Sequence, residues 1–188
     1  MQDVINLAQE VNAPTLLPSA FYDLSRYHFT QIFEQSSEEP LRSITGSNSM
    51  SLADIQRLTL GKEASQQSVA SLIHSMRSIN HHLHSGSSSP SGGMLNAHRR
   101  RASCTSAMAC RKEFSELVQL ATQHYLFDRE KGCADPLYVA EELGQLKSAE
   151  FSECEPCARA LESWAARERV RIWKLVPSWF RLDSTNMA

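Results

Sequence analysis

Residues 154–177 read CEPCARALESWAARERVRIWKLVP, and this stretch decides the fold that we expect for the chain. Its apolar residues recur every three or four positions, which is the spacing of one face of an α-helix. Proline is tolerated in the first turn of a helix and disfavoured further in, so Pro156 and Pro177 predict a helix over 156–176. The residues expected on its buried face are Cys157, Leu161, Trp164, Ala165, Ile172 and Leu175.

The same helical periodicity extends outward from this stretch. Six further segments repeat their apolar residues at intervals of three, four or seven. These segments are 3–11, 15–33, 51–61, 62–83, 111–127 and 136–147. Alternation with a period of two, which indicates strands, is found nowhere in the sequence. The prediction is an all-α protein: a small helical bundle plus a cysteine-braced C-terminal helical subdomain.

Caps set the expected ends of the early helices. Thr15 is the expected N-cap of the second helix, and Ser51 and Asp54 have the spacing of a capping box. Gly61 is expected to end that third helix as its C-cap. The residues expected to face the core are Val4, Leu7, Ala8 and Val11; Leu17, Phe21, Leu24 and His28; Leu52, Ile55 and Leu58; Val69, Leu72, Ile73, Met76 and Leu83; and Phe114, Leu117, Val118, Ala121 and Tyr125.

Serine, glycine and proline mark two interruptions of the helical pattern. Residues 35–50 favour turns and are expected to form a loop. The segment HSGSSSPSGGMLNA, which begins at position 84, has little apolar surface to bury, so we expect a flexible linker there. The sequence thus predicts a helical region over 1–83, a linker over 84–102 and a cysteine-containing helical subdomain over 103–188.

The composition is that of an ordinary globular protein. With 188 residues, 41% of them hydrophobic and 21% charged, the chain is long enough for one domain or two small helical ones. A formal net charge of -2 gives no overall attraction to nucleic acid or to an anionic membrane. A run of about 20 apolar residues and a signal-peptide pattern are both absent from the sequence. We therefore expect an intracellular protein with no membrane partner.

Two cysteine pairs carry the strongest chemical signal. Cys104 and Cys110 stand before one predicted helix, and Cys154 and Cys157 form a CxxC motif at the start of another. A helix N-terminus favours a thiolate, because its backbone N–H groups and its dipole stabilise negative charge. A CxxC motif in this position is a common half of a structural zinc site. The two pairs predict one closed site of four thiolates around one structural zinc ion, with no position for a catalytic water.

Other interpretations of the cysteines stay open. Five residues lie between Cys104 and Cys110, which is a wider gap than the usual two to about four of zinc sites, and the two pairs are far apart in the sequence. Buried free thiols or a facultative disulfide would satisfy the same pattern. Cys133 fits neither pair and is expected to take no part.

The histidines and the basic run give weaker signals. His81, His82 and His84 lie at a helix end and point in different directions, so we expect them to be solvated. The arginines at 99–101 precede Ser103 as in sites of basophilic kinases, although a solvated charge run is the simpler interpretation. The sequence motifs of hydrolases, phosphate loops and zinc proteases are not found. We therefore expect no enzymatic activity and no small-molecule substrate.

The end of the chain is rich in aromatic residues. Trp179 and Phe180 lie beyond Pro177, where the last helix is expected to end. A short aromatic tail of this kind either packs on the protein or anchors a partner. We expect it to fold back on the last helix.

Several segments together resemble the region that follows the BTB/POZ domain in a large group of BTB-domain-containing proteins of mushroom-forming fungi. The segment LPSAFY over 17–22 is similar to a helix of that region, and Asp54 to Gly61 resembles its Asp-x6-Gly segment. The two cysteine pairs and the closing RIWKLVPSWFRL are similar to its cysteine pairs and its Trp-x-x-Leu-Pro-x-x-Phe tail. Arg181 stands where this family has glycine, and Val176 where leucine is usual.

The resemblance implies an adaptor, although the BTB domain itself is absent from this chain. Dimerisation and recruitment to a cullin scaffold rest on that domain and are not carried over. The first hypothesis is therefore a non-enzymatic protein-interaction module whose partner the sequence does not name. The second is a zinc-braced module that binds nucleic acid or acts in transcription, in which the arginines at 99–101 would contact phosphate groups. Nucleic acid is the less favoured partner. The third is a thiol enzyme that uses Cys154 or Cys157.

Overall fold

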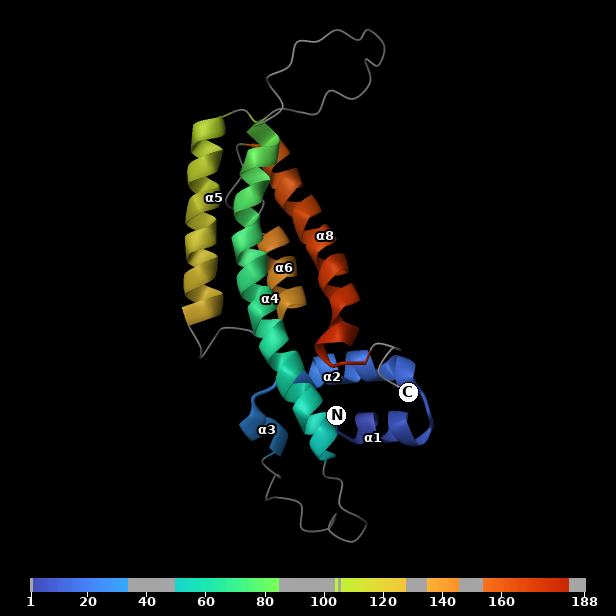
Figure 1. Cartoon of the computed structure of the whole chain (residues 1–188). Helices are drawn as coiled ribbons and strands as arrows, with labels where there is room; N and C mark the ends of the chain where they lie inside the picture. The colour runs from blue at the N-terminus through green and yellow to red at the C-terminus, as the bar shows by residue number, and fades with distance from the viewer. Residues whose placement is uncertain are drawn as a thin grey trace, which may run out of the picture. The chain divides into compact units, whose positions relative to one another are not determined.

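A computed structural model describes residues 2–33, 50–84, 104, 106–127, 135–145 and 154–182. Every regular element in these ranges is helical and none is a strand, which confirms the all-α prediction. The elements, drawn in Figure 1, are α1 (Gln2–Glu10), the 3-10 turn η1 (Pro14–Leu16), α2 (Leu17–Ser25), α3 (Phe29–Phe33), α4 (Leu52–His84), α5 (Ala107–Thr122), the π-helical turn η3 (Gln123–Phe127), α6 (Pro136–Gln145) and α8 (Glu155–Trp179). No helix within these ranges combines the length and the apolar character that crossing a membrane requires.

Contacts group the chain into two compact units. Unit 1 consists of Met1–Gln67 together with Ile172–Ala188, and unit 2 consists of Ser68–Arg171. The long helices α4 and α8 each contribute residues to both units. The grouping therefore differs from the two domains expected from the sequence, because the last residues of the chain belong with the first ones.

Two of the sequence predictions fall on segments that the structure does not describe. The expected loop over 35–50 has only Met50 within the described residues, and Met50 is buried. The expected linker over 84–102 has only His84, which ends α4. Both segments stay predictions.

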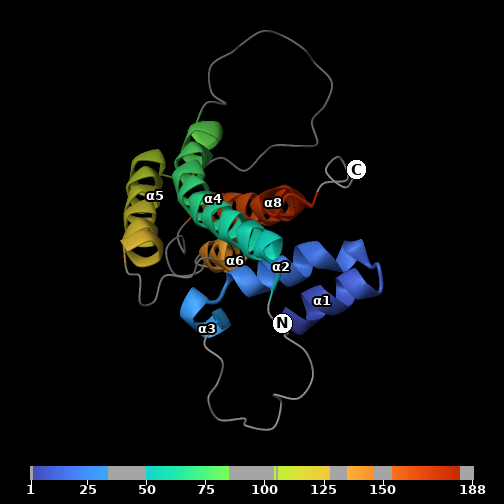
Figure 2. The same cartoon turned by 60° about the horizontal axis from the view of Figure 1, so that its bottom comes forward.

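Helices α1 and α2 lie side by side in unit 1, as Figure 2 shows. The buried residues of α1 are Ile5 and Ala8, whereas Val4, Leu7 and Val11 are exposed. The expected core face of this helix was therefore wrong except at Ala8. Both sets of residues repeat at helical spacing, so periodicity alone does not choose between them in so short a helix.

The predicted helix over 15–33 is two helices in the structure. α2 ends at Ser25, α3 begins at Phe29, and His28 between them is exposed rather than in the core. Thr15 lies in the turn η1 and is not the N-cap of α2. The sequence continues its helical spacing through this break, because each half by itself is amphipathic.

Lys62 of α4 stabilises the break after α2. Its Nζ donates hydrogen bonds to the carbonyl oxygens of Ser25, at 2.8 Å, and Tyr27, at 2.7 Å. The last carbonyls of a helix have no partner within the helix, so these bonds satisfy acceptors that would otherwise need water. Nζ also lies 5.5 Å from the centroid of the Phe29 ring, and burial lowers the pKa of this lysine.

Helix α4 continues through Gly61, where the sequence expected it to end. A Cβ atom at this position would lie only 1.9 Å from Cε1 of Phe180. The glycine therefore makes room for an aromatic ring that approaches the helix backbone. The expectation of a C-cap was wrong, because a glycine that ends a helix and a glycine that admits a neighbour look alike in the sequence.

Helix α8 also runs past its expected end, with Pro177 inside its last turn. Arg181 adopts the left-handed conformation, with φ of 52°, and its N–H donates to the Ser178 carbonyl at 3.1 Å. The Leu182 N–H donates to the Pro177 carbonyl at 2.9 Å. These two bonds form a Schellman motif, which ends the helix after Trp179.

The aromatic tail is part of the core of unit 1. The fully buried Phe180 stacks on Phe21, with 5.5 Å between the ring centroids. Tyr22 contacts Trp173 and Trp179, with centroid distances of 6.1 and 6.4 Å. The tail thus packs on α2 and α4, not back on the last helix as the sequence suggested.

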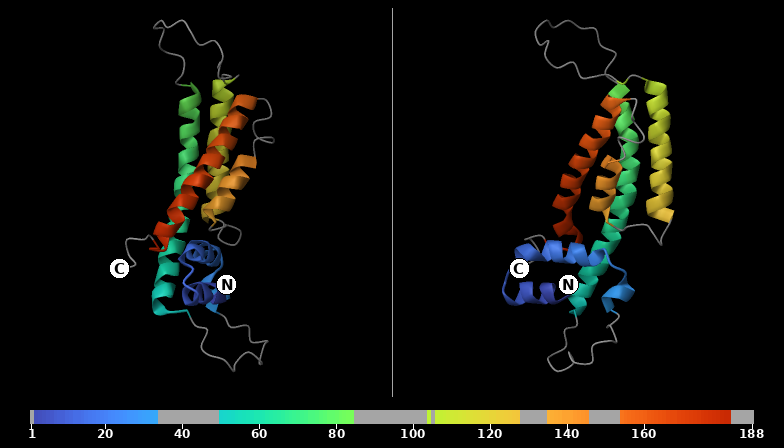
Figure 3. Two further views of the ribbon diagram at one scale, coloured as in Figure 1. Left: turned by 90° about the vertical axis from the view of Figure 1, so that its right-hand side faces the viewer. Right: turned by 180° about the vertical axis from the view of Figure 1, so that it is seen from behind.

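Unit 2 contains the second part of α4, the helices α5 and α6, and the first part of α8, which lie side by side in Figures 1 and 3. Most of their predicted core residues are buried, and these are Val69, Leu72, Ile73 and Met76; Phe114, Leu117, Val118 and Ala121; and Leu161, Trp164 and Ala165. Tyr125 is only half-buried, and two residues of unit 1 that were also expected in the core, Leu52 and Leu175, are exposed. The Trp164 indole N–H donates to Oγ of Ser75 at 3.2 Å, which joins α8 to α4. A Cβ atom at Gly144 would lie 2.7 Å from that of Ala165, so α6 and α8 approach closely.

Candidate metal centre

The first cysteine pair of the site is formed by the start of α8. The Cys154 carbonyl accepts hydrogen bonds from the N–H groups of Cys157, at 3.0 Å, and Ala158, at 3.1 Å. Cys154 therefore stands at the N-cap position and Cys157 in the first turn, with both side chains at the N-terminal end of one helix. Both cysteines are buried. Pro156 between them suits a first turn, where no intrahelical N–H is needed.

The second pair comes from the start of α5. The N–H of Cys110 donates to the Ser106 carbonyl at 3.0 Å, which closes the first turn of the helix. Cys110 is buried, and Cys104, which precedes the helix, is half-buried. The Ser106 side chain makes no capping hydrogen bond, so the helix start does not depend on a side-chain cap.

Folding brings the two pairs into one cluster within unit 2. The Sγ atoms of Cys104, Cys110, Cys154 and Cys157 all lie within 4.8 Å of one another. Sγ of Cys154 is 3.8 Å from Sγ of Cys104. A tetrahedral zinc ion with Zn–S bonds of about 2.3 Å holds its sulfur ligands about 3.8 Å apart. The four predicted ligands are thus together, at a spacing that a metal ion such as zinc fits.

The electrostatics of the cluster favour neutral thiols in the absence of a cation. Burial, together with hydrogen bonds from neighbouring thiols, raises the pKa of Cys110 to about 12. Burial and the neighbouring thiols also raise the pKa of Cys157. Removing water penalises a thiolate, and several thiolates this close would repel one another. A divalent cation reverses both effects, because its charge stabilises the deprotonated ligands.

The donor set determines what such a centre can do. Four thiolates complete the tetrahedral coordination of zinc and leave no position for water or substrate. A centre of this kind stabilises a fold and does not activate a nucleophile. The ends of α5 and α8 would be fixed together by it, although the two pairs are 50 positions apart between Cys104 and Cys154.

Several other candidate residues lie outside the described residues. Cys133 and the arginines at 99–101 are among them, as are the side chains of His81, His82 and His84. His28 and His74 are described and are exposed. The expectations for the undescribed residues stay predictions.

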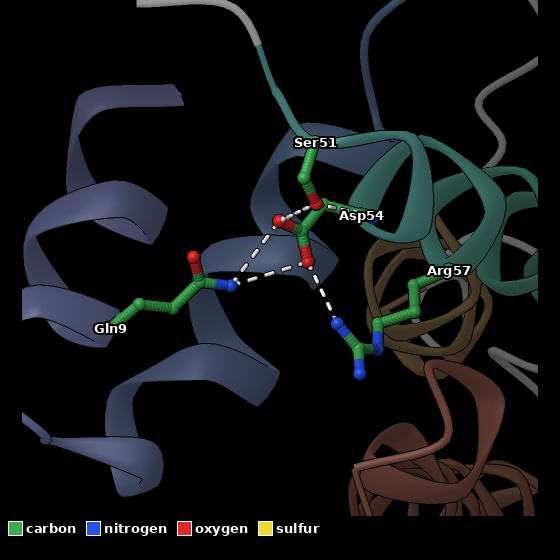
Figure 4. Close-up of polar contacts among 4 residues, drawn as sticks. All are labelled: Gln9, Ser51, Asp54 and Arg57. Atoms are coloured by element: carbon green, nitrogen blue, oxygen red, sulfur yellow. Dashed lines mark hydrogen bonds and ion pairs between the residues drawn. The ribbon is translucent and has the colours of Figure 1, made fainter.

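A second polar cluster, in unit 1, surrounds Asp54 and is shown in Figure 4. The Ser51 hydroxyl donates to Oδ2 of Asp54 at 2.6 Å and accepts the Asp54 N–H at 3.1 Å, so Ser51 caps the start of α4 as one half of the predicted capping box requires. Both carboxylate oxygens also accept from Nε2 of Gln9, at 3.2 Å each. Nη1 of Arg57 lies 2.9 Å from Oδ1. Asp54 is only 2% exposed, so these donors replace the water that a buried carboxylate loses.

Gln9 and Arg57 are not among the residues that the sequence indicated as functional. The i,i+3 spacing of Asp54 and Arg57 on one helix is a signal that could have indicated their ion pair. The contact from Gln9 comes from 45 positions away, and no local pattern indicates it.

Comparison with known proteins adds no further assignment. No protein family, curated protein or solved structure gives a significant match to this chain. The resemblance to the fungal BTB proteins therefore stays a prediction from the motifs.

Proposed function

We propose that this chain is a non-enzymatic protein-interaction module whose second unit is stabilised by one structural zinc ion. The observation that carries the proposal is the cluster of four cysteine sulfurs within 4.8 Å in unit 2. Three of the four cysteines are buried and the fourth is half-buried, as befits ligands in a closed site. Zinc suits the all-thiolate set and the tetrahedral spacing better than the hard cations, which prefer oxygen ligands.

The positions of the cysteines at helix starts support a metal role. Cys154 and Cys157 lie at the N-terminal end of α8 and Cys110 lies in the first turn of α5, where the helix dipole offsets the negative charge of thiolate ligands. The half-buried Cys104 gives a metal ion a path to the cluster from solvent. Buried free thiols without a metal would add little stability by being brought together at two helix ends.

The state of the thiols speaks against the thiol-enzyme hypothesis. A nucleophilic cysteine needs a lowered pKa and access to substrate. The two candidate nucleophiles, Cys154 and Cys157, are both buried, and burial raises the pKa of Cys157. The nucleic-acid hypothesis depends on the arginines at 99–101, which the structure does not describe, and so no contact supports it.

The motif resemblance supports an adaptor role. Three residues of the motifs that are similar to the region after the fungal BTB domain are Asp54, Gly61 and Phe180, and all three are buried in unit 1. Phe180 lies against Gly61, which gives two of these motifs a shared packing role. We propose on this basis that the chain corresponds to that region. The proposal includes nothing that rests on the BTB domain itself.

The metal half of the proposal is tested by metal analysis. Protein purified without added zinc should contain one zinc ion per chain, and chelation should lower its thermal stability, because the binding free energy of a structural metal contributes to folding. Zinc-free protein of unchanged stability would instead indicate free thiols.

The interaction half needs a separate test. The chain should retain a defined protein partner in pull-downs from cells that express it, whereas Cys157→Ser, which removes a ligand, should lose that partner if the zinc site holds the binding surface in shape. Measurable turnover of a substrate by the purified chain would contradict the non-enzymatic assignment.

A further inference from the structure

A cleft of about 390 Å³ opens on unit 1 beside the start of α4. Four of its residues follow one face of the helix at positions i, i+3, i+4 and i+7, and the fifth follows the end of α8. The lining residues are Ala53, Gln56, Arg57, Leu60 and Arg181. The cleft therefore combines two guanidinium groups and an amide with the apolar side chains of Ala53 and Leu60.

The guanidinium of Arg57 is held in place from behind. Its Nη1 pairs with Asp54 at 2.9 Å, and Asp54 is itself fixed by Gln9 and Ser51 (Figure 4). A guanidinium has five N–H donors, so one contact to Asp54 leaves others for a ligand. The Arg57 side chain is 36% exposed, which gives a ligand access to it. Arg57 is thus a preorganised donor.

Arg181 is held at the cleft by the backbone. It occupies the left-handed position of the Schellman motif, with φ of 52° and two main-chain hydrogen bonds around it. Glycine adopts this conformation with less strain than arginine does. Within the described residues no carboxylate pairs with the Arg181 side chain. Strain at a backbone position that carries a positive charge points to use of that side chain.

We propose that this cleft binds the carboxylate side chain of an acidic segment in a partner protein. Charge complementarity carries the inference, because two arginines line the cleft and Asp54 neutralises only one of them, which leaves the cleft with a net positive charge. Leu60 and Ala53 provide apolar contact for the methylene groups of a glutamate or for an adjacent apolar residue. This inference rests on the proposed interaction function and names the chemistry of the partner.

Nucleic acid is the less suitable occupant of this cleft. Its affinity arises from many neutralised phosphates along a basic track. The cleft offers two arginines, and the chain has a formal net charge of -2. A single buried carboxylate with apolar neighbours matches this small site better than an extended polyanion.

Fluorescence anisotropy with the full chain tests the proposal. The probe is a fluorescein-labelled peptide with three glutamates flanked by leucines, and the control peptide has glutamine in place of each glutamate. The wild-type chain should bind the glutamate peptide at least about tenfold more tightly, because hydrogen bonds between charged groups are the stronger ones. Arg181→Gly and Arg57→Gln should each weaken binding about tenfold.

Arg181→Gly separates binding from folding. It removes a charge from the cleft but suits the left-handed backbone, so the variant should be at least as stable as the wild type while binding more weakly. The matched control is Arg77→Gln, which removes an exposed arginine of α4 in unit 2 and should leave binding unchanged. Unfolding curves of all variants establish that weaker binding is not loss of fold.

Three results would overturn the proposal. These are equal binding of the two peptides, undiminished binding of the glutamate peptide by Arg181→Gly, and tighter binding of a labelled single-stranded oligonucleotide that displaces the peptide. Failure here leaves the proposed function standing if the chain still contains zinc and retains a partner. Loss of those two properties would instead contradict the proposed function.

Discussion

Each of the two units of this protein is stabilised internally by a different kind of interaction. In unit 1 the Phe180 ring lies against the backbone of Gly61 and stacks on Phe21, so the ends of the chain are joined by apolar packing. In unit 2 four thiols meet at the starts of α5 and α8. The stability that apolar packing provides depends on side-chain volume and not on metal or pH. The stability that a thiol centre provides depends on metal and pH and little on side-chain volume. The comparison can therefore be tested by perturbing each unit in turn.

The largest effect is expected from removing one ligand of the thiol centre. Cys157→Ser should abolish zinc binding and remove the cooperative unfolding transition of unit 2, since structural zinc contributes on the order of 10 kcal/mol. Metal analysis and thermal unfolding followed by circular dichroism measure both effects. Cys133→Ser is the matched control and should leave zinc content and stability as in the wild type. Equal behaviour of the two variants would contradict the metal centre.

Zinc affinity should depend steeply on pH. Burial, together with the hydrogen bonds from Cys104 and Cys154, raises the pKa of Cys110 to about 12. The raised pKa means that this thiol is protonated at neutral pH, so zinc must displace its proton, and affinity rises as pH rises. Competition with a chromophoric chelator at pH 6 and pH 8 should show tighter binding at pH 8. Unfolding of unit 1 should change little over the same range.

Gly61→Ala should be the most damaging single change in the apolar contact. The new Cβ would lie 1.9 Å from the Phe180 ring, so the ring or the helix must move, with a loss of about 1–3 kcal/mol in the free energy of unfolding. Urea denaturation measures the loss. The double variant Gly61→Ala with Phe180→Leu should recover part of what the two changes cost separately, because they share one contact. Strict additivity would show that the contact is not the cause, and zinc content should be unaffected throughout.

Asp54→Asn should have a smaller effect, also confined to unit 1. The substitution keeps the shape but removes the charge that accepts from Gln9, Ser51 and Arg57. Hydrogen bonds to charged groups contribute about 1.5–3 kcal/mol, and part of this remains with the amide, so we expect a loss of about 1 kcal/mol. Denaturation in urea measures it, with Glu10→Gln at the exposed end of α1 as a control that should change little.

The smallest effect expected is a gain. Arg181→Gly should raise the stability of unit 1 by about 0.5–1 kcal/mol, because glycine relieves the left-handed conformation. Asn12 occupies the same kind of position after α1, with φ of 52°, but asparagine tolerates it better. Asn12→Gly should therefore stabilise less than Arg181→Gly. Thermal unfolding in which Arg181→Gly is destabilising would contradict the strain argument.

The sequence was most informative where one local rule acted alone. The helices of unit 2 and their buried stripes follow from a repeat of three or four residues, and the capping box at Ser51 and Asp54 follows from a fixed spacing. The two cysteine pairs were visible as ligand candidates because each pair lies at a helix start. These features depend on residues within a few positions of one another, which is the range over which backbone geometry is fixed.

The tertiary structure decided everything that depends on a distant neighbour. Gly61 lies inside α4 and does not end it, and a glycine is needed there because Phe180 from the other end of the chain occupies the space that a side chain would fill. The core face of α1 is the one that carries Ile5, because two helical stripes were available and only packing selects between them. The same holds for the thiol centre of unit 2. The spacing of two cysteine pairs in the sequence cannot place their sulfurs within 4.8 Å, and only the fold, which brings the starts of α5 and α8 together, does so.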